Sequence, residues 1–154
     1  MTYAAIRIRG IINIKPDIKK TLQLLNLTRV NHCVLLEEKP NIKGMLQVAK
    51  DYITWGEIDQ EILTKLIQNR GKVEGDKKIS EEYLKSATPY SAIDKLSEAI
   101  ISKKFKYKDI PNIKPIFRLN PPKKGYEGIK RSYKNKGALG YRGKEINKLL
   151  DRMI

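Results

Sequence analysis

The chain has 154 residues, which is the size of one ordinary domain or of a small domain with an appendage. Its 32 Lys and Arg residues against 17 Asp and Glu residues give a formal net charge of +15 at pH 7, which favours a polyanionic partner, nucleic acid before a membrane surface. No apolar run approaches the roughly 20 residues of a transmembrane helix, no secretory signal opens the chain, and Cys33 is the single cysteine, so we expect an intracellular protein without disulfides.

The first 57 residues alternate strand and helix signals. Ile and Arg alternate over 3–9, which predicts a strand with one face in the core and two arginines on the other. A helix is predicted over 16–26, a strand over 32–36, a helix that Asn41 caps and that continues to Tyr52, and a strand over 53–55. This compact order predicts an α+β fold with a ferredoxin-like core, in which both helices cover one face of a three-stranded antiparallel sheet.

Helical patterns continue over 59–102. Asp59 is expected to cap the first of these helices, and residues 80–87 are expected to form a short one. Ser91 and Asp94 have the spacing of a capping box, which predicts the start of the next helix. The segment carries no net basic charge, because residues 51–100 hold 7 basic and 10 acidic side chains.

The basic charge is concentrated near the C-terminus. Residues 103–144 contain 14 Lys and Arg against two acidic residues, together with four of the seven prolines and five of the ten glycines. Such a composition is close to the range in which a chain cannot bury enough apolar surface to order itself. We therefore expect this stretch to obtain its order from a partner.

Within this tract the pattern predicts extended residues at 105–107 and 116–119, and a basic loop over 125–143. The chain then divides into a core domain over 1–57 and an extension over 58–154. The extension comprises helices over 59–102, a basic extended tail over 103–144 and a C-terminal helix over 145–154.

No catalytic or metal-binding constellation is found. His32 and Cys33 are neighbours on a predicted strand, so their side chains point to opposite faces and cannot converge on an ion or act as a nucleophile pair. What remains is a basic tract with interleaved aromatic residues, which suits phosphate neutralisation and stacking on unpaired bases. These aromatic residues are Phe105, Tyr107, Phe117, Tyr126, Tyr133 and Tyr141.

Four segments resemble a known family. TLQLLNLTRVNHCV over 21–34 and MLQVAKDYI over 45–53 resemble the signature region of large-subunit ribosomal protein thirty. DYITWGE over 51–57 and FRLNPPKKG over 117–125 are similar to the archaeal form and, more distantly, to eukaryotic large-subunit protein seven. One departure is Asn31, where a glycine is common in the bacterial motif.

The resemblance implies a structural protein of the cytoplasmic ribosome that binds large-subunit ribosomal RNA and contacts neighbouring ribosomal proteins. It implies no catalysis, cofactor, metal, membrane or small-molecule substrate. By matched motif, the implied RNA contacts are Arg7, Arg9, Lys15, Arg29, His32 and Lys43. In the basic tail, charge alone points to Lys123, Lys124, Lys130, Arg131, Lys134, Lys136 and Arg142.

Two other functions stay open at this point. One is an RNA chaperone or regulatory RNA-binding protein that acts away from the ribosome, which has the same charge pattern. The other is an RNA-modifying enzyme, for which the sequence supplies no catalytic set. A membrane-surface role is disfavoured, because Pro and Gly interrupt the basic tract and leave no long amphipathic helix.

Overall fold

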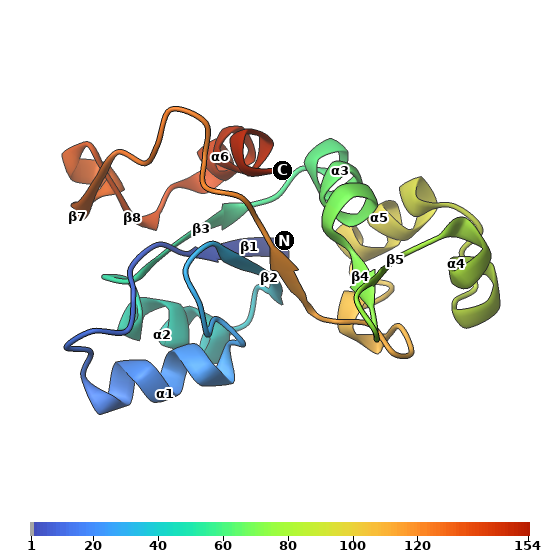
Figure 1. The fold of residues 1–154 in the computed structure, drawn as a ribbon, viewed down its shortest axis with the longest axis horizontal. Helices are drawn as coiled ribbons and strands as arrows, with labels where there is room; N and C mark the ends of the chain where they lie inside the picture. Colours follow the sequence, from blue (N-terminus) through green and yellow to red (C-terminus); the bar gives the residue numbers. More distant parts are fainter. Residues whose placement is uncertain (1) are drawn as a thin grey trace.

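A mixed six-stranded sheet forms the centre of the molecule, with helices packed on both faces (Figure 1). In this computed structural model, which describes residues 2–154, the strand order is β6-β2-β1-β3-β8-β7. The strands are β1 (Thr2–Arg7), β2 (His32–Glu37), β3 (Ile53–Glu57), β6 (Ile116–Arg118), β7 (Gly128–Ser132) and β8 (Gly137–Tyr141). The protein is therefore an α+β protein, as predicted.

The N-terminal strands and helices lie close to their predicted positions. β1 pairs antiparallel with both β2 and β3, and helices α1 (Pro16–Leu24) and α2 (Pro40–Val48) pack on one face of these strands. Each helix has a proline in its first turn, where the missing N–H costs nothing. The predicted Asn41 cap is wrong, because Lys39 occupies that position, and α2 ends before Tyr52.

The prediction that β1 exposes one face is wrong. All six of its residues are buried, including Arg7. Ala4 and Ile6 belong to the larger core cluster, and Tyr3 and Ala5 belong to the cluster beneath α1 and α2. The alternation correctly indicates a strand, but β1 is an interior strand of a sheet that is covered on both faces.

The middle of the chain forms helices α3 (Gln60–Arg70), α4 (Glu81–Ala87) and α5 (Ile93–Ile101), which join the larger core cluster. Ser80 caps α4 by accepting the N–H of Tyr83 at 3.1 Å, and Asp59 occupies the cap position of α3 without a side-chain bond. The predicted capping box before α5 is absent, because Ala92 is its cap residue. A short hairpin of β4 (Lys72–Val73) and β5 (Lys77–Lys78) has no counterpart among the predicted elements.

The basic tract packs against this core. Phe117 on β6 is fully buried between β2 and the ring of Tyr107, at 4.9 Å between ring centroids. Tyr107 begins a 3-10 helix in place of the expected extended run at 105–107. The expected loop over 125–143 contains β7 and β8, and β8 pairs in parallel with β3.

The predicted C-terminal helix is present as α6 (Ile146–Met153), after a 3-10 turn at Gly143–Glu145. Ile146, Leu149, Leu150 and Met153 bury its apolar face in the larger core cluster. The first and last thirds of the chain thus share one core.

Close contact between β3 and this 3-10 turn gives the first test of the arrangement. A Cβ at Gly56 would lie 1.9 Å from the carbonyl oxygen of Gly143, so Gly56→Ala should destabilise the protein by about 2–3 kcal/mol through overpacking. A Cβ at Gly10 meets no atom within 4 Å, so Gly10→Ala should change stability by about 0.5 kcal/mol or less. Urea unfolding measures both, and equal effects would contradict the packing of the C-terminal segment on β3.

Candidate nucleic-acid interface

Arg7 and Arg9, two predicted contact residues, differ in exposure. The guanidinium of Arg7 is buried and donates from Nε to the carbonyl of Arg9 (2.9 Å) and from Nη1 to the carbonyl of Leu27 (2.8 Å). Arg9 is partly exposed and lies over the ring of Tyr52, 5.1 Å from its centroid. Arg7 therefore fixes the loops on either side of α1, and Arg9 faces solvent.

A group of cations surrounds the first residue of β2. His32 is half-buried and lies opposite Arg118 across the β2–β6 ladder, and Arg29 is exposed three residues before it. We call Arg29, His32 and Arg118 the His32 cluster. Burial, followed by the charges of Arg118, Arg29 and Arg7, lowers the pKa of His32 below its ordinary 6.5. In the free chain, the lowered pKa favours the neutral form of the His32 imidazole at pH 7.

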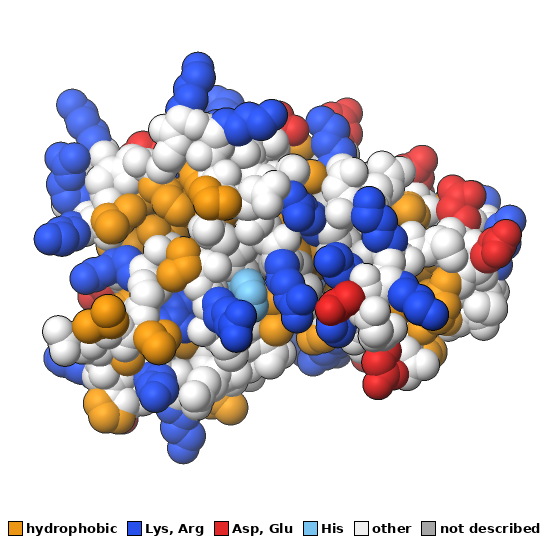
Figure 2. Space-filling model, viewed as in Figure 1, with side chains coloured by type: hydrophobic (Ala, Val, Ile, Leu, Met, Phe, Trp, Pro, Cys, Tyr) orange, Lys and Arg blue, Asp and Glu red, His pale blue; other side chains and the backbone are white. Residues whose placement is uncertain are grey.

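The exposed charges are unevenly distributed over the molecule. Figure 2 shows the single histidine side chain near the centre of this face, with Lys and Arg side chains beside it. Acidic side chains gather toward the right-hand end, where α4 and α5 lie in Figure 1. A polyanion would accordingly be attracted to the sheet and not to the helical end.

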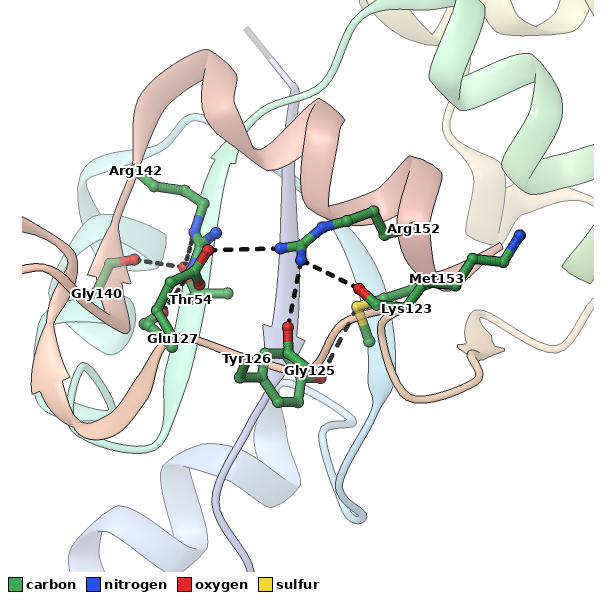
Figure 3. A network of polar contacts seen from close by, with 10 residues as sticks. Thr54, Lys123, Gly125, Tyr126, Glu127, Gly140, Arg142, Arg152 and Met153 are labelled. Atoms are coloured by element: carbon green, nitrogen blue, oxygen red, sulfur yellow. Dashed lines mark hydrogen bonds and ion pairs between the residues drawn. The ribbon is translucent and has the colours of Figure 1, made fainter.

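The C-terminal helix holds the turn that carries Lys123 and Lys124 (Figure 3). Arg152 donates from Nη1 to the carbonyls of Lys123 (3.2 Å) and Gly125 (3.3 Å), and its own carbonyl accepts the N–H of Lys123 (3.2 Å). Both lysines are exposed. Their charges project from a backbone that is held by bonds to α6, which reduces the conformational freedom lost on binding.

Asn31 joins this turn to the His32 cluster. Its φ of 66° lies in the left-handed region that Asn tolerates, and its Oδ1 accepts the hydroxyl proton of Tyr126 at 2.5 Å. Its carbonyl accepts the N–H of Leu119 at 3.1 Å. A glycine could adopt the same backbone conformation, but it could not bond Tyr126. The departure from the bacterial motif at this position is thus part of how the C-terminal segment attaches.

Arg142, another predicted contact, is buried inside the structure (Figure 3). Its Nε donates to Thr54 Oγ1 (2.8 Å) and its Nη2 donates to the carbonyl of Ala138 (2.7 Å). Its guanidinium lies over the ring of Tyr133 at 5.0 Å and 3.9 Å from a carboxylate oxygen of Glu127. Arg142 therefore links β3, β8 and the turn after β7, and it holds neighbouring cations in place.

Those neighbouring cations are four exposed side chains on the outermost part of the sheet. β7 is an edge strand, and the 3-10 turn that follows it, Tyr133–Asn135, leads into β8. The four exposed cations are Lys130, Arg131, Lys134 and Lys136. The backbone of this region is close-packed, because a Cβ at Gly137 would lie 2.0 Å from the carbonyl oxygen of Arg131.

Lys15 and Lys43 lie on the helices and not on the strands that carry the His32 cluster. Lys15 is exposed at the cap position of α1. Lys43 on α2 forms an ion pair with Glu38 at 2.8 Å, which lowers the pKa of that carboxyl to about 2. Glu38 follows the far end of β2, roughly 20 Å of strand from His32. The predicted contact residues therefore form several groups and not one site.

Sequence reasoning did not select Arg118 as a candidate contact residue. The sequence does indicate that Arg118 is exposed, because apolar and polar residues alternate in this segment. Phe117 and Leu119 point inward, and Arg118 is exposed between them. Only the pairing with β2 reveals that it lies opposite His32. Arg118 also has a carboxylate neighbour, with Asp76 Oδ1 at 3.4 Å.

Other kinds of site were sought in the described part of the chain. Across residues 2–154, no three His, Cys, Asp or Glu side chains are grouped so that they could hold a metal ion. No helix within the same residues combines the length and the apolar character needed to cross a membrane. Cys33 is fully buried in the core.

The fold and its exposed cations define an α+β protein with a basic surface suited to RNA. The sequence model of the family described as "Ribosomal protein L30p/L7e" matches residues 3–53. Relatives named "Large ribosomal subunit protein uL30" are similar over nearly the whole chain.

In Methanosphaera stadtmanae the identity is 49%, with 99% of each chain covered. In Thermoplasma volcanium it is 52%, with 98% of this chain and 92% of the relative covered. In Methanocorpusculum labreanum it is 44%, with 98% and 99% covered. The chain belongs to the uL30 family, which confirms the resemblance seen in its motifs.

The Asn31–Tyr126 bond predicts a specific pattern of stabilities. Asn31→Gly and Tyr126→Phe should each cost about 1 kcal/mol by removing one hydrogen bond, and the double variant should cost little more than either alone. Asn31→Ala should cost about 1 kcal/mol more than Asn31→Gly, because alanine is strained at this φ. Urea unfolding of the four variants checks this, and strictly additive losses would contradict direct coupling of the two residues.

Titration of His32 predicts how stability depends on pH. Because the folded chain lowers the pKa of His32, the unfolded chain binds the proton more readily, and stability should fall as pH decreases below about 6.5. His32→Gln cannot titrate and should lose less stability between pH 7.5 and pH 5. Unfolding midpoints of both proteins across this range measure the difference, and parallel curves would count against the predicted shift.

Proposed function

We propose that this chain is a structural, non-enzymatic constituent of the large ribosomal subunit that binds ribosomal RNA and stabilises its tertiary fold. The observation that carries the proposal is the near-full-length identity of 43–52% to relatives named for that subunit. Its place is the cytoplasmic ribosome, and its partners are large-subunit ribosomal RNA and neighbouring large-subunit proteins.

The proposed RNA surface consists of the predicted cations that face solvent, with Arg118 added. Lys and Arg on this surface would displace counterions condensed on RNA phosphates, so affinity should fall steeply with salt. Recognition would follow RNA shape and 2′-hydroxyl contacts, since the major groove of an RNA helix is too deep and narrow for side chains to read. The surface comprises Arg9, Lys15, Arg29, His32, Lys43, Arg118, Lys123, Lys124, Lys130, Arg131, Lys134 and Lys136.

Arg7 and Arg142 have a different proposed part. Their guanidinium groups are buried and bonded to backbone carbonyls or to Thr54, so they do not face an RNA phosphate at the surface. They position the exposed cations on the loops that they join.

We also propose that residues 1–57 correspond to the core common to the family, with ferredoxin-like connectivity, and that residues 58–154 form an extension. The antiparallel order β2-β1-β3 and the family match over residues 3–53 support this division. The extension adds β6 on one side of the three strands and β8 with β7 on the other.

The test compares two pairs of exposed lysines that lie in different parts of the fold. Lys123→Gln with Lys124→Gln should weaken binding to deproteinised large-subunit ribosomal RNA. The slope of log affinity against log salt should fall by roughly 0.7–0.9 for each phosphate that the variant no longer neutralises. The matched control is Lys77→Gln with Lys78→Gln on β5, which removes the same charge from the hairpin beside the helical end. Filter binding over a range of salt concentrations gives both slopes.

Equal losses of affinity from the two pairs would indicate a general charge effect and contradict the proposed surface. Sedimentation with large subunits in sucrose gradients tests the assignment to the ribosome itself. Stoichiometric co-migration is expected, and RNA binding without co-migration would instead favour an RNA chaperone that acts away from the ribosome.

A further inference from the structure

A groove of about 500 Å³ opens at the side of β2 that β6 leaves uncovered. β6 pairs with β2 only from His32 to Val34, whereas β2 continues to Glu37. Leu35, Leu36 and Glu37 all line the groove. The groove therefore lies along the end of β2 that has no partner strand, and the backbone of that strand forms part of its wall.

The backbone of β2 at this groove faces outward at two positions. The N–H of Ile58 donates to the carbonyl of Thr2 (3.1 Å), so the backbone N–H and C=O of Thr2 point toward β3. Those of Tyr3 then point toward β2, where they pair with Leu36. Leu36 therefore directs its backbone groups to β1, and its neighbours Leu35 and Glu37 direct their backbone N–H and C=O groups to the opposite edge of β2, away from β1.

No strand within residues 2–154 pairs with that edge beyond Val34. The register puts Pro115 opposite Leu35, and proline has no N–H to donate. Ile113, the next residue in line with Glu37, donates its N–H to Ile110 (3.3 Å) and bridges to Val73 instead. The chain thus turns away at Pro115 and leaves the carbonyl of Leu35 and both polar groups of Glu37 at an open edge.

The walls of the groove are apolar on both faces of the sheet. Leu36 packs with the cluster beneath α1 and α2, and Met45 lines that side. Leu35 packs with the larger cluster, and Phe105 and Tyr107 line the other side. A strand added to β2 would send alternate side chains into these two apolar halves.

The rim of the groove is basic. Lys39, Lys103, Lys106 and Lys108 line it, and Glu37 is its single acidic residue. Lys39 and Lys106 both form ion pairs with Glu37, at 2.9 Å and 3.5 Å. Lys103 and Lys108 supply positive charge beyond that pairing.

We propose that this groove binds an extended, acidic peptide segment of a neighbouring protein, which adds to β2 as a strand in line with β6. The open backbone edge favours an extended peptide, the two apolar halves favour alternating apolar side chains, and the lysine rim favours flanking carboxylates. The inference goes beyond the proposed RNA-binding function and does not depend on it.

The test uses a capped, fluorescently labelled peptide, Glu-Glu-Val-Ile-Val-Glu-Glu, and its counterpart with Lys in place of each Glu. Fluorescence anisotropy on the full chain should show saturable binding of the acidic peptide and at least tenfold weaker binding of the basic one. Glu37→Pro removes the outward N–H while leaving the β1 ladder intact, and should weaken binding of the acidic peptide at least tenfold. Glu37→Ala is the matched control: it loses the same carboxylate but keeps the N–H, so it should bind as tightly as the native chain or tighter.

Hydrogen exchange on the native chain provides a measurement that does not depend on how the variants fold. The acidic peptide should slow exchange of the Glu37 amide at least tenfold. No binding up to 1 mM peptide, equal binding by the proline and alanine variants, or unchanged exchange of the Glu37 amide would overturn the proposal. Displacement of the peptide by single-stranded poly(U), with the same loss in Glu37→Pro, would assign the groove to RNA and overturn it as well.

Discussion

Burial of both faces of β1 is the constraint on which the rest of the fold depends. A six-residue strand with no exposed side chain needs a covering layer on each side. Helices α1 and α2 supply one layer from nearby sequence. The other layer comes from α3, α5 and α6, so the last helix of the chain completes the environment of its first strand. This long-range dependence makes the extension part of the core and not an appendage to it.

Folding a chain with this surplus of positive charge requires that buried cations be bonded and that the others reach solvent. Arg142 bonds a carbonyl and a threonine hydroxyl, and Arg7 bonds two carbonyls through Nε and Nη1, while its Nη2 is buried without a hydrogen-bond partner. Burial lowers the pKa of both, yet guanidinium stays protonated because its ordinary pKa is so high. Arginine suits this role better than lysine, because its planar group bonds several loops at once. Arg7 and Arg142 thus hold in place loops whose other lysines and arginines are exposed to solvent.

Local patterns predicted most of the first half of the fold and part of the second. Period-2 and helical spacing identified β1, β2, β3, α1 and α3, because each has a buried stripe that its own sequence displays. The same patterns failed at β7 and β8, where Gly137 and Gly140 interrupt the alternation and the strand forms by pairing with β3 more than eighty residues away. Composition showed the charge of the basic tract but not where its apolar residues pack. Its few apolar residues, such as Phe117 and Leu139, are buried, and a low apolar fraction is sufficient when another part of the chain supplies the core.

The candidate contact residues were predictable by type but not by exposure. Charge and motif selected twelve lysines and arginines together with His32. Local sequence could not distinguish a lysine on an exposed turn from an arginine that is bonded to carbonyls across the sheet. Arg142 lies in the same basic stretch as Lys136, yet Thr54 is the partner that fixes it, and that contact spans 88 residues. The pairing of His32 with Arg118 has the same character. The electrostatic consequence follows from this topology. Burial of the imidazole lowers the pKa of His32, and the charges of Arg118 and Arg29, which the sheet brings beside it, lower that pKa further.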